Sequence, residues 1–145
     1  MMERARLLFL TGLGAGYSPW APGTVGTVVG LVLYLIFLHR FSWFLYLCFT
    51  LILLFLGVWA SNDGQRLFQE EDSPHIVIDE IVGYLITMWG IRFGFWPVVL
   101  GFILFRVWDI WKPFSGLEEI PGGWGVMLDD VVAGVLANIM LRIIF

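Results

Sequence analysis

Two pairs of adjacent acidic residues stand beside long apolar runs, where a charge is costly if the run enters a membrane. Asp79 and Glu80 directly precede one apolar run, and Asp129 and Asp130 stand near the start of the last one. Adjacent residues of a helix point about 100° apart, so both members of a pair can flank one buried seam. If the two pairs converge, their oxygens form a cage suited to a hard divalent cation such as Mg²⁺.

Each acid pair also has a plainer interpretation. Carboxylates in the first turn of a helix interact favourably with the helix dipole, and Asp79 and Glu80 can serve only as such a cap. The glycines before Asp129 predict a flexible approach to a helix N-terminus. Beyond them, Asp130 and the small residues at positions 133, 134 and 137 form a stripe with helical spacing, which predicts that Asp130 faces neighbouring helices instead of lipid.

A third charged cluster lies in the segment FRVWDIWKP, residues 105–113. Arg106, Asp109 and Lys112 are spaced by three and therefore share one face of a helix. Charged residues near the end of a membrane helix either extend to the interface or line a site. Extension to the interface explains Lys112 more easily than Arg106, so this face is a candidate anion site.

A glycine-rich segment, GLGAGYSPWAPGTVGT, covers residues 12–27. Its Pro-Gly pair at Gly23 suits a tight turn, and Thr24 and Thr27 follow at the start of the next helix. Backbone amides and hydroxyls in this arrangement can bind a phosphate. The alternative is close helix packing, because Gly26 and Gly30 have GxxxG spacing.

The composition identifies the setting in which these residues act. The chain has 145 residues, of which 59% are hydrophobic and 14% charged, and a mean hydropathy of +0.87. It is too apolar for a soluble domain of this length, which predicts an integral membrane protein with a single domain, residues 1–145. The net charge of -4 argues against nucleic acid as a partner. The lone Cys48 excludes an internal disulfide.

The apolar runs predict helices. They cover residues 25–38, 41–60, 81–105 and 126–145. The third run is too long for one span and is interrupted by Gly90, Arg92, Gly94 and Pro97, which predict a tight turn. We therefore expect an all-α, polytopic membrane protein with about four to five short hydrophobic helices and an N-terminal segment at the membrane interface.

If successive helices cross the membrane in alternating directions, the charged residues divide unequally between its two faces. With the N-terminus inside, all 12 acidic residues fall on the inner face, together with five of the eight lysines and arginines. The positive-inside bias is in the expected direction but small. Such an excess of acid repels anionic lipid unless cations bind there, which again favours a metal-dependent site.

Four motifs in this order resemble those of the phosphatidylglycerophosphatase A family: SPWAPGTVGT, IVIDEIVG, FRVWDIWKP and GGWGVMLDDVVAG. The resemblance covers about residues 12–134. It departs at Phe114, where the family tends to have a second proline. It implies a magnesium-dependent, multi-pass phosphatase of the bacterial inner membrane, with its active site facing the cytoplasm. Its substrate would be phosphatidylglycerophosphate and its products phosphatidylglycerol and phosphate. The oligomeric state stays open, with a homodimer as one alternative.

Together with this resemblance, the residues suggest a division of roles. The catalytic set comprises Asp79, Glu80, Asp129 and Asp130, one of which is the base or nucleophile. The metal ligands are these four residues and Asp109. The phosphate-binding set comprises Arg106, Lys112, Gly23, Thr24 and Thr27.

Two other classes of protein fit some of the same features. Carboxylates in a membrane also mark ion pathways, so a small ion or proton-coupled transporter with carboxylates at its cytoplasmic mouth is the main alternative. Against it, the acids are predicted at one face, and the sequence shows no evident inverted repeat. In a purely structural membrane subunit, the same acids and glycines would serve assembly alone.

Overall fold

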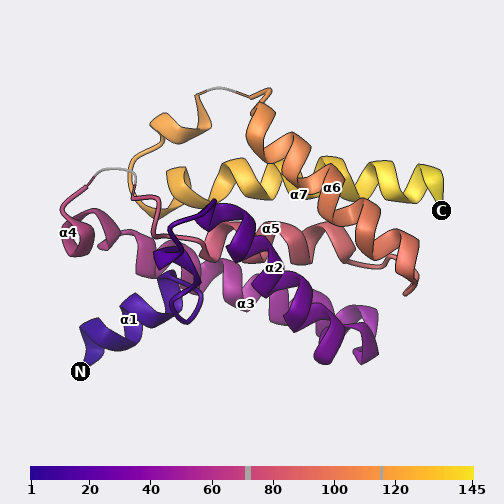
Figure 1. The fold of residues 1–145 in the computed structure, drawn as a ribbon, viewed down its shortest axis with the longest axis horizontal. Coiled ribbons are helices and arrows are strands. Elements are labelled where there is room, and N and C mark those ends of the chain that lie inside the picture. The colour runs from indigo at the N-terminus through magenta and orange to yellow at the C-terminus, as the bar shows by residue number, and fades with distance from the viewer. Residues whose placement is uncertain (71–72, 115) are drawn as a thin grey trace.

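The computed structural model describes residues 1–70, 73–114 and 116–145, and every regular element over these residues is a helix (Figure 1). The α-helices are α1 (Met2–Leu10), α2 (Pro22–Ile36), α3 (Trp43–Ser61), α4 (Gly64–Phe68), α5 (Ile78–Met88), α6 (Phe95–Trp111) and α7 (Gly123–Ile144). Short 3-10 helices are η1 (Ala15–Tyr17), η2 (Leu38–Arg40) and η3 (Leu117–Glu119). The predicted all-α class is confirmed.

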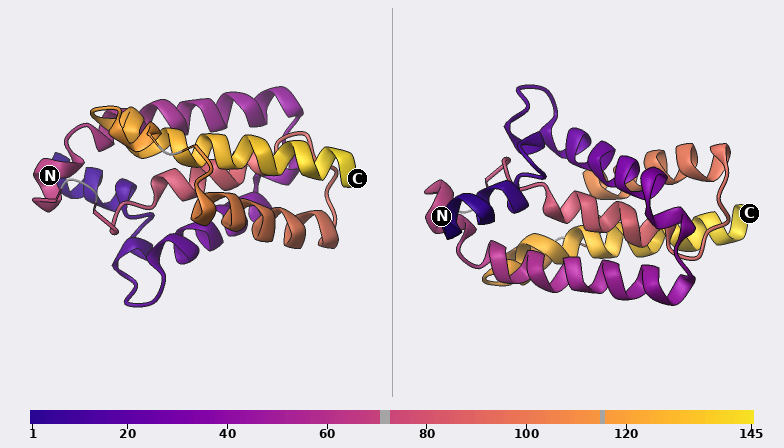
Figure 2. Two further views of the ribbon diagram at one scale, coloured as in Figure 1. Left: turned by 90° about the horizontal axis from the view of Figure 1, so that it is seen from above. Right: turned by 90° about the horizontal axis from the view of Figure 1, so that it is seen from below.

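The helix α5 lies at the centre of the bundle. It contacts α2, α3, α6 and α7, which lie around it along the long axis of the molecule (Figures 1 and 2). Eight of its 11 residues are buried, among them Tyr84 and Leu85 in the hydrophobic core. Neighbouring helices therefore pack against α5 from several sides and fix the position of its first residues.

Glycines allow α5 and α7 to approach closely. A Cβ atom built on Gly83 would lie 2.9 Å from the carbonyl oxygen of Asp130, and one on Gly134 would overlap the carbonyl oxygen of Gly83. The helices can cross at this separation only because neither glycine has a side chain. Asp130, Ala133 and Gly134 are buried on this side of α7, as the small-residue stripe predicts.

Two helical segments are long and apolar enough to cross a membrane: Pro22–Arg40 and Trp43–Ser61. By contrast, α5 has 11 residues and rises about 16 Å. This is about half the thickness of a bilayer's hydrocarbon core, so α5 cannot span it alone. The expectation of four to five membrane helices, and of an N-terminal segment at the interface, stays a prediction.

The helix ends agree with the sequence in one place and differ in another. The predicted turn is confirmed, since α5 ends at Met88 and α6 begins at Phe95, with Pro97 in the first turn of α6. The predicted flexible approach to Asp129 is wrong, because Gly123 and Gly125 are already helical. A Cβ on either glycine would overlap a backbone carbonyl oxygen, so both are required for packing.

Candidate active site

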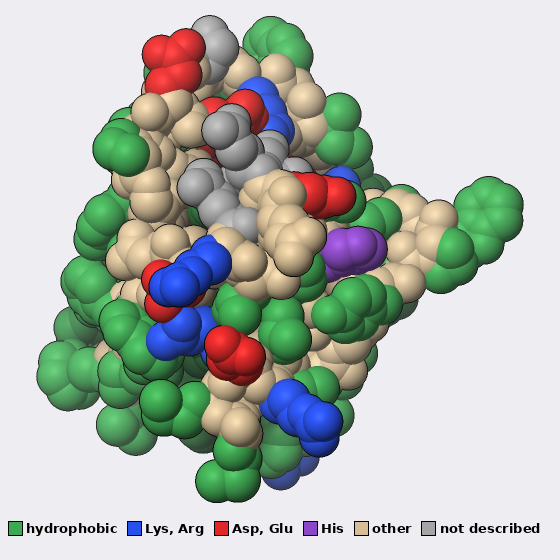
Figure 3. All heavy atoms as spheres, turned by 90° about the vertical axis from the view of Figure 1, so that its left-hand side faces the viewer, with side chains coloured by type: hydrophobic (Ala, Val, Ile, Leu, Met, Phe, Trp, Pro, Cys, Tyr) green, Lys and Arg blue, Asp and Glu red, His purple; other side chains and the backbone are tan. Residues whose placement is uncertain are grey.

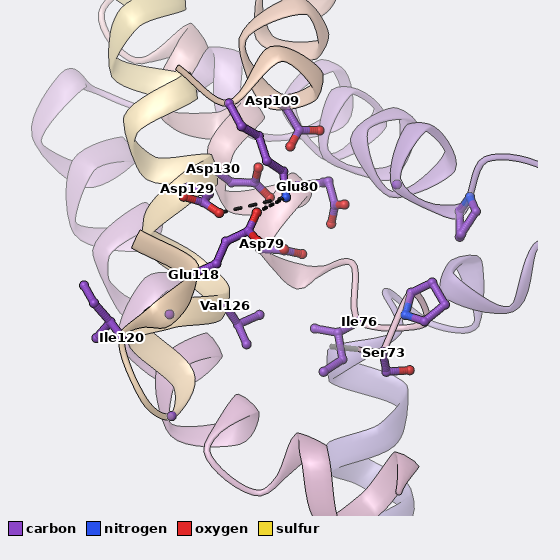
Figure 4. A pocket seen from close by; sticks show the side chains of 16 residues that line it. Ser73, Ile76, Asp79, Glu80, Asp109, Glu118, Ile120, Val126, Asp129 and Asp130 are labelled. Atoms are coloured by element: carbon purple, nitrogen blue, oxygen red, sulfur yellow. Dashed lines mark hydrogen bonds and ion pairs between the residues drawn. The ribbon is translucent and has the colours of Figure 1, made fainter. Parts of the chain in front are cut away.

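A cavity of about 440 Å³ opens at the end of the bundle where α5 and α7 begin and α6 ends. The charged residues that line it are Asp79, Glu80, Asp109, Lys112, Glu118, Asp129 and Asp130. Pro22 and Gly23 from the start of α2 and Ser73, Pro74 and Ile76 before α5 complete much of the wall. Figure 4 shows the acidic side chains entering the cavity from three different helices and from the η3 segment.

Three carboxylates converge in this cavity. Asp79, Glu80 and Asp130 each place one carboxylate oxygen within 4.8 Å of the others. Asp79 and Glu80 lie in the first turn of α5, and Asp130 lies in the second turn of α7 with only 2% of its surface exposed. The close crossing of α5 and α7 at Gly83 thus brings the two sequence motifs together.

Two carboxylate oxygens of this cluster lack a hydrogen-bond partner among the described residues. Among the described residues, Asp79 Oδ1 and Glu80 Oε2 are buried and have no hydrogen-bond partner. An unpaired buried polar group costs about 1–3 kcal/mol, and a charged group costs more. The negative charges at such short range also repel each other. Oxygen-only donors in this arrangement fit a hard divalent cation, which would offset both costs.

A buried ion pair borders the three carboxylates. Arg106 on α6 donates to Asp109 one turn later, and the two side chains are only 16% and 10% exposed. Gly23 adjoins this pair: a Cβ there would lie 2.7 Å from Glu80 Oε1 and 3.5 Å from Arg106 Nη1. The start of α2 can approach Glu80 and Arg106 because position 23 has no side chain.

Lys112 also lines the cavity. It caps the C-terminus of α6 in a left-handed conformation, with φ 48°. Its ammonium group pairs with Glu118 and lies 3.9 Å from Asp129 Oδ2. Burial lowers the pKa of Lys112, but the hydrogen bond and charge of Glu118 raise it above its usual value. The same hydrogen bond lowers the pKa of Glu118, so both groups are charged near neutral pH.

Comparison with known proteins identifies the family of the chain. The model of the phosphatidylglycerophosphatase A family matches residues 8–145. The chain belongs to the phosphatidylglycerophosphatase A family. Relatives named phosphatidylglycerophosphatase A come from Escherichia coli and Haemophilus influenzae. The first is 33% identical over 90% of this chain and 77% of the relative. The second is 35% identical over 92% of this chain and 85% of the relative.

A further relative has a different name. A Bacteroides thetaiotaomicron protein, provisionally named phosphatidylinositol-3-phosphatase, is 38% identical over 94% of this chain and 91% of its own length. No solved structure matches the chain at a significant level. Membership of the phosphatidylglycerophosphatase A family therefore rests on the sequence of nearly the whole chain.

The structure does not bring every predicted site residue of this family member into one cluster. Asp129 lines the cavity but lies beside Lys112, apart from the three clustered carboxylates. Thr27 is buried, and its hydroxyl donates to the carbonyl oxygen of Gly23 at 2.9 Å. Thr24 is half-buried, and neither threonine is among the described residues that line the cavity. The catalytic, metal-binding and phosphate-binding roles assigned to the site residues, those of Asp129, Thr24 and Thr27 included, stay predictions.

Sequence reasoning missed Glu118. It lies six residues after Lys112, in a segment without a helical pattern, and reaches the cavity because the chain turns back after the left-handed cap. The pattern gives no direct signal for this contact. A lysine and a glutamate stand on either side of a short segment that contains proline and glycine. Such a segment favours a turn, which would bring the two side chains together.

Proposed function

We propose that this protein is a magnesium-dependent lipid phosphatase that hydrolyses the terminal phosphomonoester of phosphatidylglycerophosphate to phosphatidylglycerol and phosphate. Membership of the family and the names of the E. coli and H. influenzae relatives support the substrate. The observation that carries the chemistry is the convergence of Asp79, Glu80 and Asp130, with unpaired buried oxygens, in a cavity that also contains Lys112.

In this mechanism Asp79, Glu80 and Asp130 would hold Mg²⁺. An ion bound there would supply positive charge for the phosphate oxygens and would favour ionisation of water. Lys112, which also lines the cavity, donates hydrogen bonds to the phosphate and neutralises part of its charge. Arg106, kept in place by Asp109, adds positive charge beside Gly23.

Asp129 is the group we assign to proton transfer. It lines the cavity and lies outside the three clustered carboxylates, so its carboxylate is available to accept a proton from the attacking water. The ammonium group of Lys112 lies 3.9 Å from Asp129 Oδ2. When the P–O bond breaks, the same carboxyl group can return this proton to the alcohol oxygen that leaves, so the proton balances over the reaction.

We further propose that the protein is a multi-pass protein of the bacterial inner membrane and that the cavity faces the cytoplasm. The helices α2 and α3 form one membrane hairpin, and α6 and α7 lie in the bilayer beside it. Charged side chains gather on the end face near the N-terminus, among hydrophobic side chains toward its edge (Figure 3). A lipid phosphate at the membrane surface can reach a cavity at this end.

A second candidate substrate is a phosphoinositide with a 3-phosphate, which the name of the B. thetaiotaomicron relative favours. Both candidates present a phosphomonoester on a lipid headgroup, so the same carboxylates and cations serve either one. They differ in the alcohol that leaves, which is a glycerol or an inositol.

The experiment is phosphate release by purified protein in detergent, with phosphatidylglycerophosphate or phosphatidylinositol 3-phosphate, in Mg²⁺ and then in a chelator. We expect release from phosphatidylglycerophosphate that requires Mg²⁺ and is lost in Asp130→Asn. Faster release from the phosphoinositide would show that this lipid, and not phosphatidylglycerophosphate, is the preferred substrate. No release from either lipid by folded protein would refute the phosphatase, and cation flux in vesicles would then test the transporter alternative.

A further inference from the structure

An exposed apolar loop joins α1 to α2. Residues 12–21 contain no charged side chain, although they belong to the end of the molecule where charged residues gather. Leu13, Tyr17 and Trp20 are 83%, 55% and 82% exposed. The loop projects beyond the helices in both views of Figure 2. Large apolar side chains that cluster on a surface usually mark a contact with another apolar phase.

The position of the loop along the chain identifies that phase. Trp20 lies two residues before Pro22, the first residue of a segment long and apolar enough to cross a membrane. On the outer side of this helix Val28, Val32 and Ile36 are exposed. A residue just before a membrane helix lies at the height of the lipid headgroups, where Trp and Tyr are enriched.

The backbone of the loop is adapted to a layer with little water. Ser18 Oγ donates to the carbonyl oxygen of Trp20 at 2.9 Å and accepts from the Trp20 N–H at 3.3 Å. The N–H of Gly16 donates to the carbonyl oxygen of Thr11 at 2.9 Å. Polar backbone groups with partners inside the loop can enter the interface at a low desolvation cost.

Contacts at the base hold the loop in its projecting position. His75 Nδ1 lies 2.9 Å from the carbonyl oxygen of Gly16, and the His75 ring packs on Tyr17 with centroids 5.0 Å apart. Leu13 and Ala21 adopt left-handed conformations, with φ 60° and 40°, that non-glycine residues rarely adopt. Packing must maintain such a backbone, so the loop has a defined shape.

We infer that residues 13–20 form an interfacial anchor that places Trp20 and Leu13 in the boundary between lipid headgroups and acyl chains. This inference rests on the membrane location given under the proposed function. Pro22 and Gly23, which follow the anchor directly, line the cavity. The anchor therefore sets the height of the cavity relative to the lipid phosphates, so that a headgroup enters while its acyl chains stay in the bilayer.

A fluorescence measurement tests the location of the anchor without requiring catalysis. In a Cys48→Ser background, Trp20→Cys and Glu119→Cys each carry an environment-sensitive fluorophore, in phosphatidylcholine vesicles with and without lipids spin-labelled near the headgroup. Glu119 is an exposed control on η3, which borders the cavity at the same end. We expect at least threefold stronger quenching at position 20. Equal quenching at the two positions would overturn the anchor.

A kinetic measurement tests its effect on the cavity. Trp20→Ala should raise the apparent KM for the lipid substrate in vesicles at least threefold, with less than a twofold change in detergent micelles. Trp96→Ala is the matched control, because Trp96 is 64% exposed at the start of α6, away from the cavity. An unchanged KM for Trp20→Ala in vesicles would overturn the positioning effect. Absence of any phosphate release refutes only the phosphatase, since quenching reports the loop separately.

Discussion

Gly83 on α5 lies directly against the backbone of Asp130 on α7. A Cβ at position 83 would be 2.9 Å from the Asp130 carbonyl oxygen and 2.5 Å from the ring of Phe105. These neighbours are backbone and a buried aromatic ring, so neither can move aside easily. The contact connects the packing of the bundle to the geometry of the carboxylates.

Gly83→Ala should therefore disturb both stability and activity. We expect a loss of about 1–3 kcal/mol, typical of overpacking in a core, and a loss of phosphatase activity because Asp130 is displaced from Asp79 and Glu80. Thermal unfolding in detergent and phosphate release measure the two effects. Gly94→Ala is the control, since its Cβ would meet Pro97 at 3.4 Å and its φ of 175° suits any residue. Similar behaviour of the two variants would contradict this role of Gly83.

Asp130→Asn should separate stability from function. The substitution removes one of three clustered negative charges while nearly preserving the volume, so we expect unchanged or higher thermal stability in a chelator, by about 1 kcal/mol. Activity should fall by about 100-fold or more, because a proposed Mg²⁺ ligand is lost. A variant that is less stable and still active would show that Asp130 has a structural role instead.

Mg²⁺ should stabilise the folded protein by mass action. At about 100 times its dissociation constant, a ligand that binds only the folded state contributes about 2.7 kcal/mol, which thermal unfolding detects easily. We expect this stabilisation in the parent protein and in Asp63→Asn, whose carboxylate pairs with Arg6 outside the cavity. It should be strongly reduced in Asp79→Asn. Equal stabilisation of all three proteins would place the metal elsewhere.

Lys112 should contribute to substrate affinity over a wide pH range. Its raised pKa means that the ammonium group keeps its proton to higher pH than a free lysine does. Lys112→Met should raise KM about tenfold, with a ratio to the parent that stays constant from about pH 7 to about pH 9. Lys112→Arg, which keeps the charge, should restore part of the affinity. A ratio that falls steadily over this range would indicate that Lys112 loses its proton there.

The sequence predicted the helical class and the clusters of residues at the cavity, because both depend on local patterns. The length of an apolar run predicts a helix, and acids at its edge are rare enough to mark a site. The grouping of the carboxylates depends instead on contacts between residues that are distant in sequence. Asp130 joins Asp79 and Glu80, whereas its neighbour Asp129 points to Lys112, and this division follows from the crossing of α5 and α7 at Gly83.

The start of α7 illustrates a second limit of sequence reasoning. A run of glycines normally weakens a helix, so the sequence predicts a flexible segment before Asp129. In the structure, backbone carbonyl groups of neighbouring segments lie so close to Gly123 and Gly125 that only glycine fits. This packing outweighs the low helix propensity of the two glycines. Such space constraints come from Val58 and Ile120, which no local pattern connects to these glycines.

The central position of α5 has a consequence for the bilayers in which the protein can work. Because eight of its 11 residues are buried among neighbouring helices, α5 has little surface that touches acyl chains. In the proposed multi-pass arrangement, bilayers of different thickness act first on the outer helices, which can tilt to match them. The carboxylates at the start of α5 should therefore move little when the outer helices tilt. Changes in membrane composition should alter access of the substrate to the cavity more than the geometry in which its phosphate binds.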